Sequence, residues 1–91
     1  MTYRIYTEDL KSDLVAGIVS QYFDGFTMYH AQGYWKGTFE GSLVIEIITD
    51  NQTSTAEGSA TTIGYICKQI KRLNKQSSIL VQKFQNDAWM V

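Results

Sequence analysis

The sequence is poor in the features that direct a chain to a membrane, to secretion or to disulfide formation. Its 91 residues include a single cysteine, Cys67, so no internal disulfide can form, which is typical of a reducing compartment. No run of about 18 apolar residues is present, so no transmembrane helix is predicted. The first residues, MTYRIYTEDL, lack the basic and then apolar plan of a signal peptide. We therefore expect a cytoplasmic protein without membrane contact.

Residues that perform chemistry are also scarce. His30 is the single histidine, and together with Cys67 it does not make a recognisable metal site. The segment GYWKG at 33–37 lacks the spacing of a phosphate-binding loop and does not precede a predicted helix. We expect no metal, no cofactor and no catalytic residues. The sequence favours a protein that is not an enzyme but leaves the question open.

Charge is sparse and unevenly spread. Charged residues make up 19% of the chain, and the formal net charge is −1. The stretch 58–86 has no acidic residue, and its basic residues are Lys68, Lys71, Arg72, Lys75 and Lys83. Such asymmetry is compatible with an anionic partner, or with a solvated face that the acidic first half balances. We favour the solvated face.

The hydrophobic share of 44% is enough for one core, so residues 1–91 are expected to form a single domain. Alternation of apolar residues predicts strands, and a spacing of three and four predicts helices. The first helix is expected to begin at Thr7 as N-cap and to bury Leu10, Leu14, Ile18 and Tyr22. The predicted elements are strands at 2–6, 26–31, 43–48 and 77–84, helices near 8–23 and 60–75, and a flexible loop at 50–59.

This β-α-β-β-α-β order predicts an α+β fold of the ferredoxin-like kind, with two helices on one face of a four-stranded antiparallel sheet. Apolar residues occur on both faces of several strands, and the end of the chain, 88–91, is apolar as well. Burial of a second sheet face by association is the usual solution. We therefore expect a homo-oligomer.

The hairpin segment GYWKGTFEG, residues 33–41, is the main candidate for a ligand-binding site. Gly37 and its neighbouring glycines free the backbone to approach a ligand, Lys36 offers a positive charge, and Tyr34 or Trp35 offers a flat apolar face. The alternative is an aromatic hairpin tip that packs on a neighbouring subunit.

Three more residues are candidates for the same ligand site. Glu46 interrupts an apolar strand, so it faces solvent, pairs with a base such as Lys83, or lines a cleft. Lys83 would reach that cleft from a neighbouring chain. His30 would act as a general base only with an orienting carboxylate, for which Glu40 and Glu46 are the candidates; the alternative is an ordinary strand histidine.

Nucleic acid is not an expected partner. RNA-recognition domains share this element order, but their third strand carries aromatic residues that stack on bases. Here the third strand reads SLVIEII, and the pI of 5.7 is low for a phosphate-binding protein.

The element order, the long hairpin and the segment GFTMYHAQGYWKG…SLVIEI resemble the PII-like and CutA-like superfamily. The resemblance implies trimers that pack sheet against sheet, with nucleotides or other small anions in clefts between subunits. By position, residues 33–41 would be the mobile loop that closes over the ligand, and Lys36 would be its cation.

We therefore expect a non-enzymatic, oligomeric protein of PII-like type that binds a small ligand, a nucleotide or small anion, or a signal. A homotrimer is preferred over a dimer. One alternative is a protein-interaction module, such as a small inhibitor or adaptor, that uses the aromatic hairpin. The other is a dimeric α+β-barrel enzyme in which His30 faces a cavity.

Overall fold

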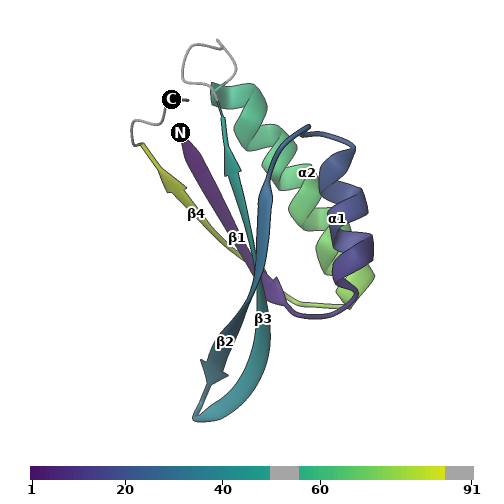
Figure 1. The fold of residues 1–91 in the computed structure, drawn as a ribbon, viewed down its shortest axis with the longest axis vertical. Helices are drawn as coiled ribbons and strands as arrows, with labels where there is room; N and C mark the ends of the chain where they lie inside the picture. Colours follow the sequence, from purple (N-terminus) through teal and green to yellow (C-terminus); the bar gives the residue numbers. More distant parts are fainter. Residues whose placement is uncertain (50–55, 86–91) are drawn as a thin grey trace.

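The computed structural model describes residues 1–49 and 56–85. Its elements are β1 (Thr2–Glu8), α1 (Ser12–Ser20), β2 (Thr27–Trp35), β3 (Thr38–Ile48), α2 (Ala56–Asn74) and β4 (Leu80–Phe84). The strands form one antiparallel sheet in the order β2-β3-β1-β4, and both helices lie on the same side of it (Figure 1). The ferredoxin-like α+β fold predicted from the sequence is confirmed.

The core lies between this sheet and the two helices. Residues that pair across neighbouring strands point to the same face, so Met28, Ile45 and Ile5 form one row on β2, β3 and β1. Ile66 and Ile70 of α2 are fully buried against this side of the sheet. Their spacing of four residues places both on the same face of α2.

The first helix differs from the prediction in its start and in the face that it buries. β1 continues to Glu8, and α1 begins only at Ser12. Thr7 is therefore a strand residue paired with Leu43 and not an N-cap. The buried residues of α1 are Val15 and Val19. The expected stripe is largely exposed, with Leu14 at 56% and Tyr22 at 41%. The segment has apolar residues on two faces. In the helix that begins at Ser12, the face with Val15 and Val19 packs against the core.

The second helix begins earlier than predicted. α2 starts at Ala56, so the end of the expected loop at 50–59 is helical, which agrees with the high helix propensity of alanine. The first part of that loop and the apolar end of the chain, 88–91, lie outside the described residues. Neither helix, as far as the chain is described, is long and apolar enough to cross a membrane.

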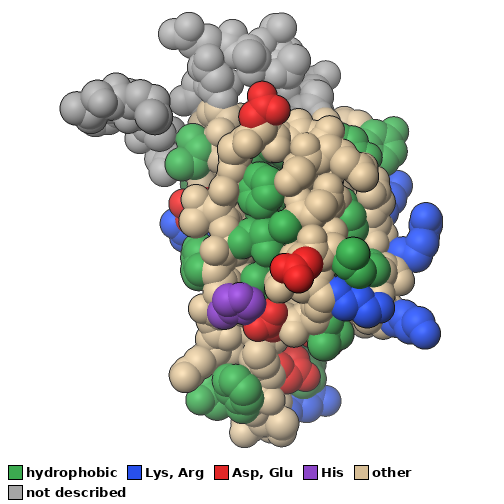
Figure 2. Space-filling view, turned by 45° about the vertical axis from the view of Figure 1, so that its right-hand side comes forward, with side chains coloured by type: hydrophobic (Ala, Val, Ile, Leu, Met, Phe, Trp, Pro, Cys, Tyr) green, Lys and Arg blue, Asp and Glu red, His purple; other side chains and the backbone are tan. Residues whose placement is uncertain are grey.

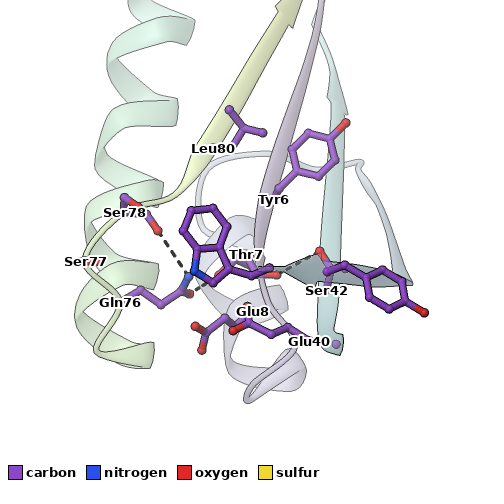
Figure 3. Close-up of a pocket in the computed structure, with 13 residues that line it drawn as sticks. Tyr6, Thr7, Glu8, Glu40, Ser42, Gln76, Ser77, Ser78 and Leu80 are labelled. Carbon is purple, nitrogen blue, oxygen red and sulfur yellow. Dashed lines mark hydrogen bonds between the residues drawn. The ribbon is translucent and has the colours of Figure 1, made fainter. Parts of the chain in front are cut away.

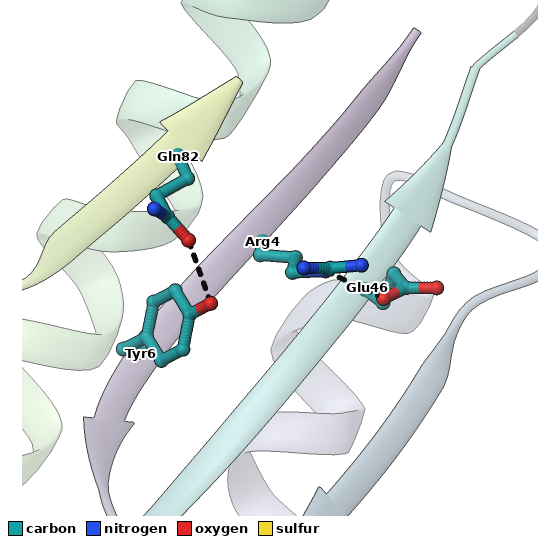
Figure 4. Close-up of polar contacts among 4 residues, drawn as sticks. All are labelled: Arg4, Tyr6, Glu46 and Gln82. Atoms are coloured by element: carbon teal, nitrogen blue, oxygen red, sulfur yellow. Dashed lines mark hydrogen bonds and ion pairs between the residues drawn. The ribbon is translucent and has the colours of Figure 1, made fainter. Parts of the chain in front are cut away.

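Within the described part of the chain, the opposite face of the sheet carries side chains that neither helix covers. Tyr29, Tyr6 and Leu80 lie in one row on this face, with Tyr29 at 42% and Leu80 at 61% exposure. In the next row, Arg4 Nε lies 2.8 Å from Glu46 Oε2, and the Tyr6 hydroxyl donates to Gln82 Oε1 at 2.7 Å (Figure 4). This uncovered sheet face therefore combines exposed apolar groups with a central ion pair.

Candidate functional site

The hairpin of β2 and β3 extends beyond the rest of the sheet (Figure 1). Its strands pair as far as Trp35 and Thr38, and only Lys36 and Gly37 form the turn, with φ angles of 51° and 78°. Positive φ at both positions is typical of a type I′ turn. Residues 33–41 are therefore paired strand and tight turn, and not the loop that the family resemblance implied.

We call residues 33–41, the end of this hairpin, the hairpin arm. Its two strands approach each other closely at Gly33. A Cβ on Gly33 would lie 3.0 Å from the carbonyl oxygen of Glu40, its partner across the hairpin. This is tighter than nine in ten contacts of a real Cβ, so a side chain at this position would require the paired strands to shift by a few tenths of an ångström. Gly33 thus keeps the arm narrow beside the hollow described next.

A hollow of about 480 Å³ opens where the hairpin arm, the end of β1 and the turn between α2 and β4 meet (Figure 3). Its walls come from segments far apart in the sequence. They are formed by Tyr6, Thr7, Glu8, Gly33, Tyr34, Trp35, Glu40, Gly41, Ser42, Gln76, Ser77, Ser78 and Leu80. We call it the hairpin pocket.

The hairpin pocket is acidic and aromatic. Two carboxylates, of Glu8 and Glu40, line it together with the rings of Tyr6, Tyr34 and Trp35, and no lysine or arginine is among its lining residues. Tyr34 and Trp35 are 68% and 65% exposed, so their rings are accessible to a ligand, although Lys36 lies over one face of the Trp35 ring. Carboxylates attract positive charge, and aromatic faces bind cations and flat rings. Such walls suit a neutral or cationic aromatic compound better than an anion.

The wall opposite the arm is held by a buried polar network at the end of α2. Asn74 is 8% exposed, and its Nδ2 donates to Gln76 Oε1 at 2.9 Å and to Thr7 Oγ1 at 3.3 Å. The Thr7 hydroxyl in turn donates to Gln76 Oε1. Three side chains from β1, the end of α2 and the following turn thus fix one another.

The structure brings only part of the predicted site together. Tyr34 and Trp35 line the hairpin pocket. Lys36 and Gly37 form the turn next to it, and Lys36 Nζ lies 5.8 Å from the centre of the Trp35 ring. His30, Glu46 and Lys83 lie elsewhere and do not line the hairpin pocket.

His30 pairs with a carboxylate that the sequence did not suggest. Its Nδ1 lies 2.6 Å from Asp9 Oδ2, whereas Glu40 and Glu46 were the expected partners. His30 pairs with Leu43 across the strands and Glu46 pairs with Thr27, so the two residues occupy opposite faces of the sheet. Figure 2 shows the histidine beside acidic side chains on the molecular surface.

Glu46 and Lys83 also lie on opposite faces and do not pair. Lys83 is in register with Tyr3, which faces the helices, while Glu46 binds Arg4 on the uncovered sheet face (Figure 4). The hydrogen bond from Arg4 to Glu46 is the largest cause that raises the pKa of the guanidinium. Of the expected environments for Glu46, pairing with a base is the observed one, but the base is Arg4.

The walls of the hairpin pocket that lie outside residues 33–41 were not predicted from the sequence. Glu8 was placed at the start of the first predicted helix, and Gln76 was placed between the second predicted helix and the last predicted strand. Glu40 was considered only as a partner for His30. The signal available in the sequence was the acidic residue within the glycine-rich hairpin, but its neighbours in the fold come from 6–8 and 76–80.

Cys67 packs against the core on α2 and is half-buried. Burial raises the pKa of its thiol from 9.0 to about 11, although Lys71 opposes part of this change. The thiolate is the reactive form, so labelling of native protein at pH 8 should be about 100-fold slower than labelling of an ordinary thiol. The labelling rate is measured, with and without denaturant, by the absorbance of the coloured group that a thiol reagent releases. Equal rates in the two conditions would contradict it.

No group of three or more histidine, cysteine, aspartate or glutamate side chains in the described part of the chain could hold a metal ion. The acidic residues of the hairpin pocket therefore do not converge as metal ligands do.

No protein-family model matches the chain, and no curated protein matches it. Solved structures do. A phage SAM lyase in the apo state aligns with a TM-score of 0.70 and 20% identity, over 88% of this chain and 75% of that chain. A phage SAM lyase in complex with S-methyl-5'-thioadenosine aligns with a TM-score of 0.70 and 18% identity, over 88% and 76%.

The de novo designed protein Foldit4 is also similar, with a TM-score of 0.53 and 15% identity over 94% of both chains. An enzyme and a designed protein therefore share this fold. At such low identities the similarity establishes the fold alone, and function must be argued from the site.

Proposed function

We propose that this protein is an oligomeric small-ligand-binding protein and that its ligand is an adenine nucleoside bearing positive charge, with S-adenosylmethionine as the specific candidate. The observation that carries the proposal is the chemistry of the hairpin pocket. Glu8 and Glu40 would attract a sulfonium or ammonium group, and Trp35 would stack on a purine ring.

The same chemistry favours a cationic nucleoside over the nucleotide or small anion expected from the sequence. A nucleotide phosphate brings negative charge without a positive group of its own, and in the hairpin pocket it would meet two carboxylates and no basic side chain, which is unfavourable. Lys36 would serve an anion only from the turn beside the pocket. We therefore propose that the ligand is a nucleoside, as the expected nucleotide would be, but that it carries a positive group in place of the phosphate.

A second candidate function is cleavage of this ligand. The structural neighbours are named SAM lyases, and one of them holds S-methyl-5'-thioadenosine, which is S-adenosylmethionine without its amino-acid end. For the present chain, cleavage is a proposal that rests on shared fold and on the acidic pocket. It would make the protein an enzyme, in contrast to the preference from the sequence.

We further propose that the uncovered sheet face is where copies associate, as a homotrimer in preference to a dimer and in the cytoplasm. Ile48 at 55% and Leu80 at 61% exposure support this, because apolar groups on a sheet face favour association. Tyr6 and Leu80 belong both to this face and to the hairpin pocket, so association would help to close the pocket.

Isothermal titration tests the binding proposal. S-adenosylmethionine and S-methyl-5'-thioadenosine should bind, and ATP, which carries the same base with a strongly negative chain, should not. Mass spectrometry of the S-adenosylmethionine mixture would detect S-methyl-5'-thioadenosine if cleavage occurs. Binding of ATP alone would restore the small-anion expectation, and binding of none would favour the interaction module.

Light scattering tests the association proposal separately. A mass of three chains is expected at micromolar concentration, and a monomer would contradict it. Ile48→Glu, which places a charge on the uncovered sheet face, should lower the measured mass, whereas the same charge at Ser20 on the exposed surface of α1 should not.

A further inference from the structure

The turn between α2 and β4 supplies hydrogen-bond donors to a pocket whose other wall is acidic. Gln76, Ser77 and Ser78 line the hairpin pocket from this turn, across from the arm that carries Glu40 (Figure 3). Amide and hydroxyl groups donate to anionic oxygens. The pocket therefore has one wall suited to positive charge and one suited to a carboxylate.

The buried network fixes which end of the Gln76 amide serves the ligand. Gln76 Oε1 already accepts from Asn74 Nδ2 and from the Thr7 hydroxyl. The nitrogen is therefore turned away from the network, where its contact is with the Ser78 carbonyl oxygen at 3.5 Å, the outer limit of a hydrogen bond. An amide nitrogen carries two hydrogens, so at least one remains for a ligand.

The backbone at the helix end holds Gln76 in this position. Lys75 adopts a left-handed conformation with a φ of 55°. The backbone N–H of Gln76 donates to the Lys71 carbonyl oxygen at 3.0 Å. This is the hydrogen bond of a Schellman motif, which ends a helix and turns the chain sharply. The donor is thus positioned before any ligand arrives.

We infer that the Gln76 side-chain nitrogen donates to the carboxylate of the ligand's amino-acid end, while Glu8 and Glu40 face its positive groups. The inference rests on the proposed function and deepens it. Gln76 becomes a specificity-determining residue that separates nucleosides with an amino-acid end from those without one. Asn74, which does not line the pocket, is a positioning residue that acts through Gln76.

Two uncharged-sulfur analogues of the ligand, both thioethers, differ in whether they carry the amino-acid end. S-adenosylhomocysteine has it, and S-methyl-5'-thioadenosine lacks it. The variant Gln76→Glu keeps an oxygen toward Thr7 and Asn74 but replaces the donor in the pocket with an acceptor. It should weaken the binding of S-adenosylhomocysteine by about 10- to 100-fold, the effect of losing a charge-assisted hydrogen bond. The binding of S-methyl-5'-thioadenosine should weaken by less than about three-fold. Isothermal titration measures both.

Gln69→Glu is the matched control, because Gln69 has the same side chain on α2 but bonds to the Tyr22 hydroxyl, outside the pocket. It should change neither affinity. Gln76→Met, uncharged and of similar length, should also weaken the binding of S-adenosylhomocysteine more than that of S-methyl-5'-thioadenosine, but with a smaller loss of affinity. Circular dichroism confirms that each variant is folded.

Equal losses for the two thioethers, or no loss for either, in a wild-type protein that binds them would overturn this inference and leave the proposed function standing. A wild-type protein that binds neither thioether and does not bind S-adenosylmethionine would overturn both.

Discussion

Replacement of Glu40 by glutamine is expected to weaken the binding of S-adenosylmethionine by about 10- to 100-fold. The Glu40 carboxylate lines the hairpin pocket with Glu8 as the only other acid, so its neutralisation removes half of the negative charge that faces the ligand. S-methyl-5'-thioadenosine carries no positive charge and should lose little affinity. Isothermal titration with the two compounds measures the difference.

Asp24→Asn is the control for this prediction, because it makes the same change of charge at an exposed residue that does not line the pocket. The Glu40 effect should also shrink as salt is added, since exposed charges are screened. An equal loss for both compounds would contradict the prediction, because it would assign to Glu40 a role in holding the arm.

Replacement of Ile45 by alanine is expected to lower the free energy of unfolding by about 2–5 kcal/mol. Ile45 is fully buried in the middle of the sheet, between Met28 and Ile5, so the missing carbons leave a cavity that the paired strands cannot close. A chain of this size has a stability of roughly 5–15 kcal/mol, so this variant would unfold at much lower denaturant. Denaturation followed by circular dichroism measures the change.

Ile48→Ala tests the same substitution on the same strand at a residue that is 55% exposed. Its effect on the monomer should stay below about 0.5 kcal/mol. Because copies are proposed to associate through this face, any further loss at Ile48 should grow with protein concentration. A large loss at Ile48 that is independent of concentration would show that the assignment of core and uncovered face is wrong.

The fold was predictable because its signals are local. The short apolar run at 43–48, interrupted only by Glu46, marks a buried strand, and Ile63, Ile66 and Ile70 mark a helix face, whatever lies elsewhere in the chain. The start of α1 was not predictable in this way. Residues 7–10 suit a helix start by composition, and the strand wins because Thr7 pairs with Leu43 and bonds to Gln76, which are distant in sequence.

The candidate site was predictable only where it is local too. Tyr34 and Trp35 stand out in the hairpin sequence and do line the pocket. Glu8 and Gln76 join them through strand order and the end of α2, which no spacing in the sequence expresses. His30 and Glu46 seemed close across a hairpin, but strand register places them on opposite faces.

In the described chain, every residue other than glycine with a positive φ is a lysine: Lys11, Lys36 and Lys75. Left-handed backbone disfavours a lysine by roughly 1–2 kcal/mol, whereas asparagine tolerates it. A lysine codon becomes an asparagine codon by a change in its third base. At Lys36 that change would create the Asn-Gly pair preferred in this turn. Point mutation can thus reach a more stable chain without altering one residue that lines the pocket.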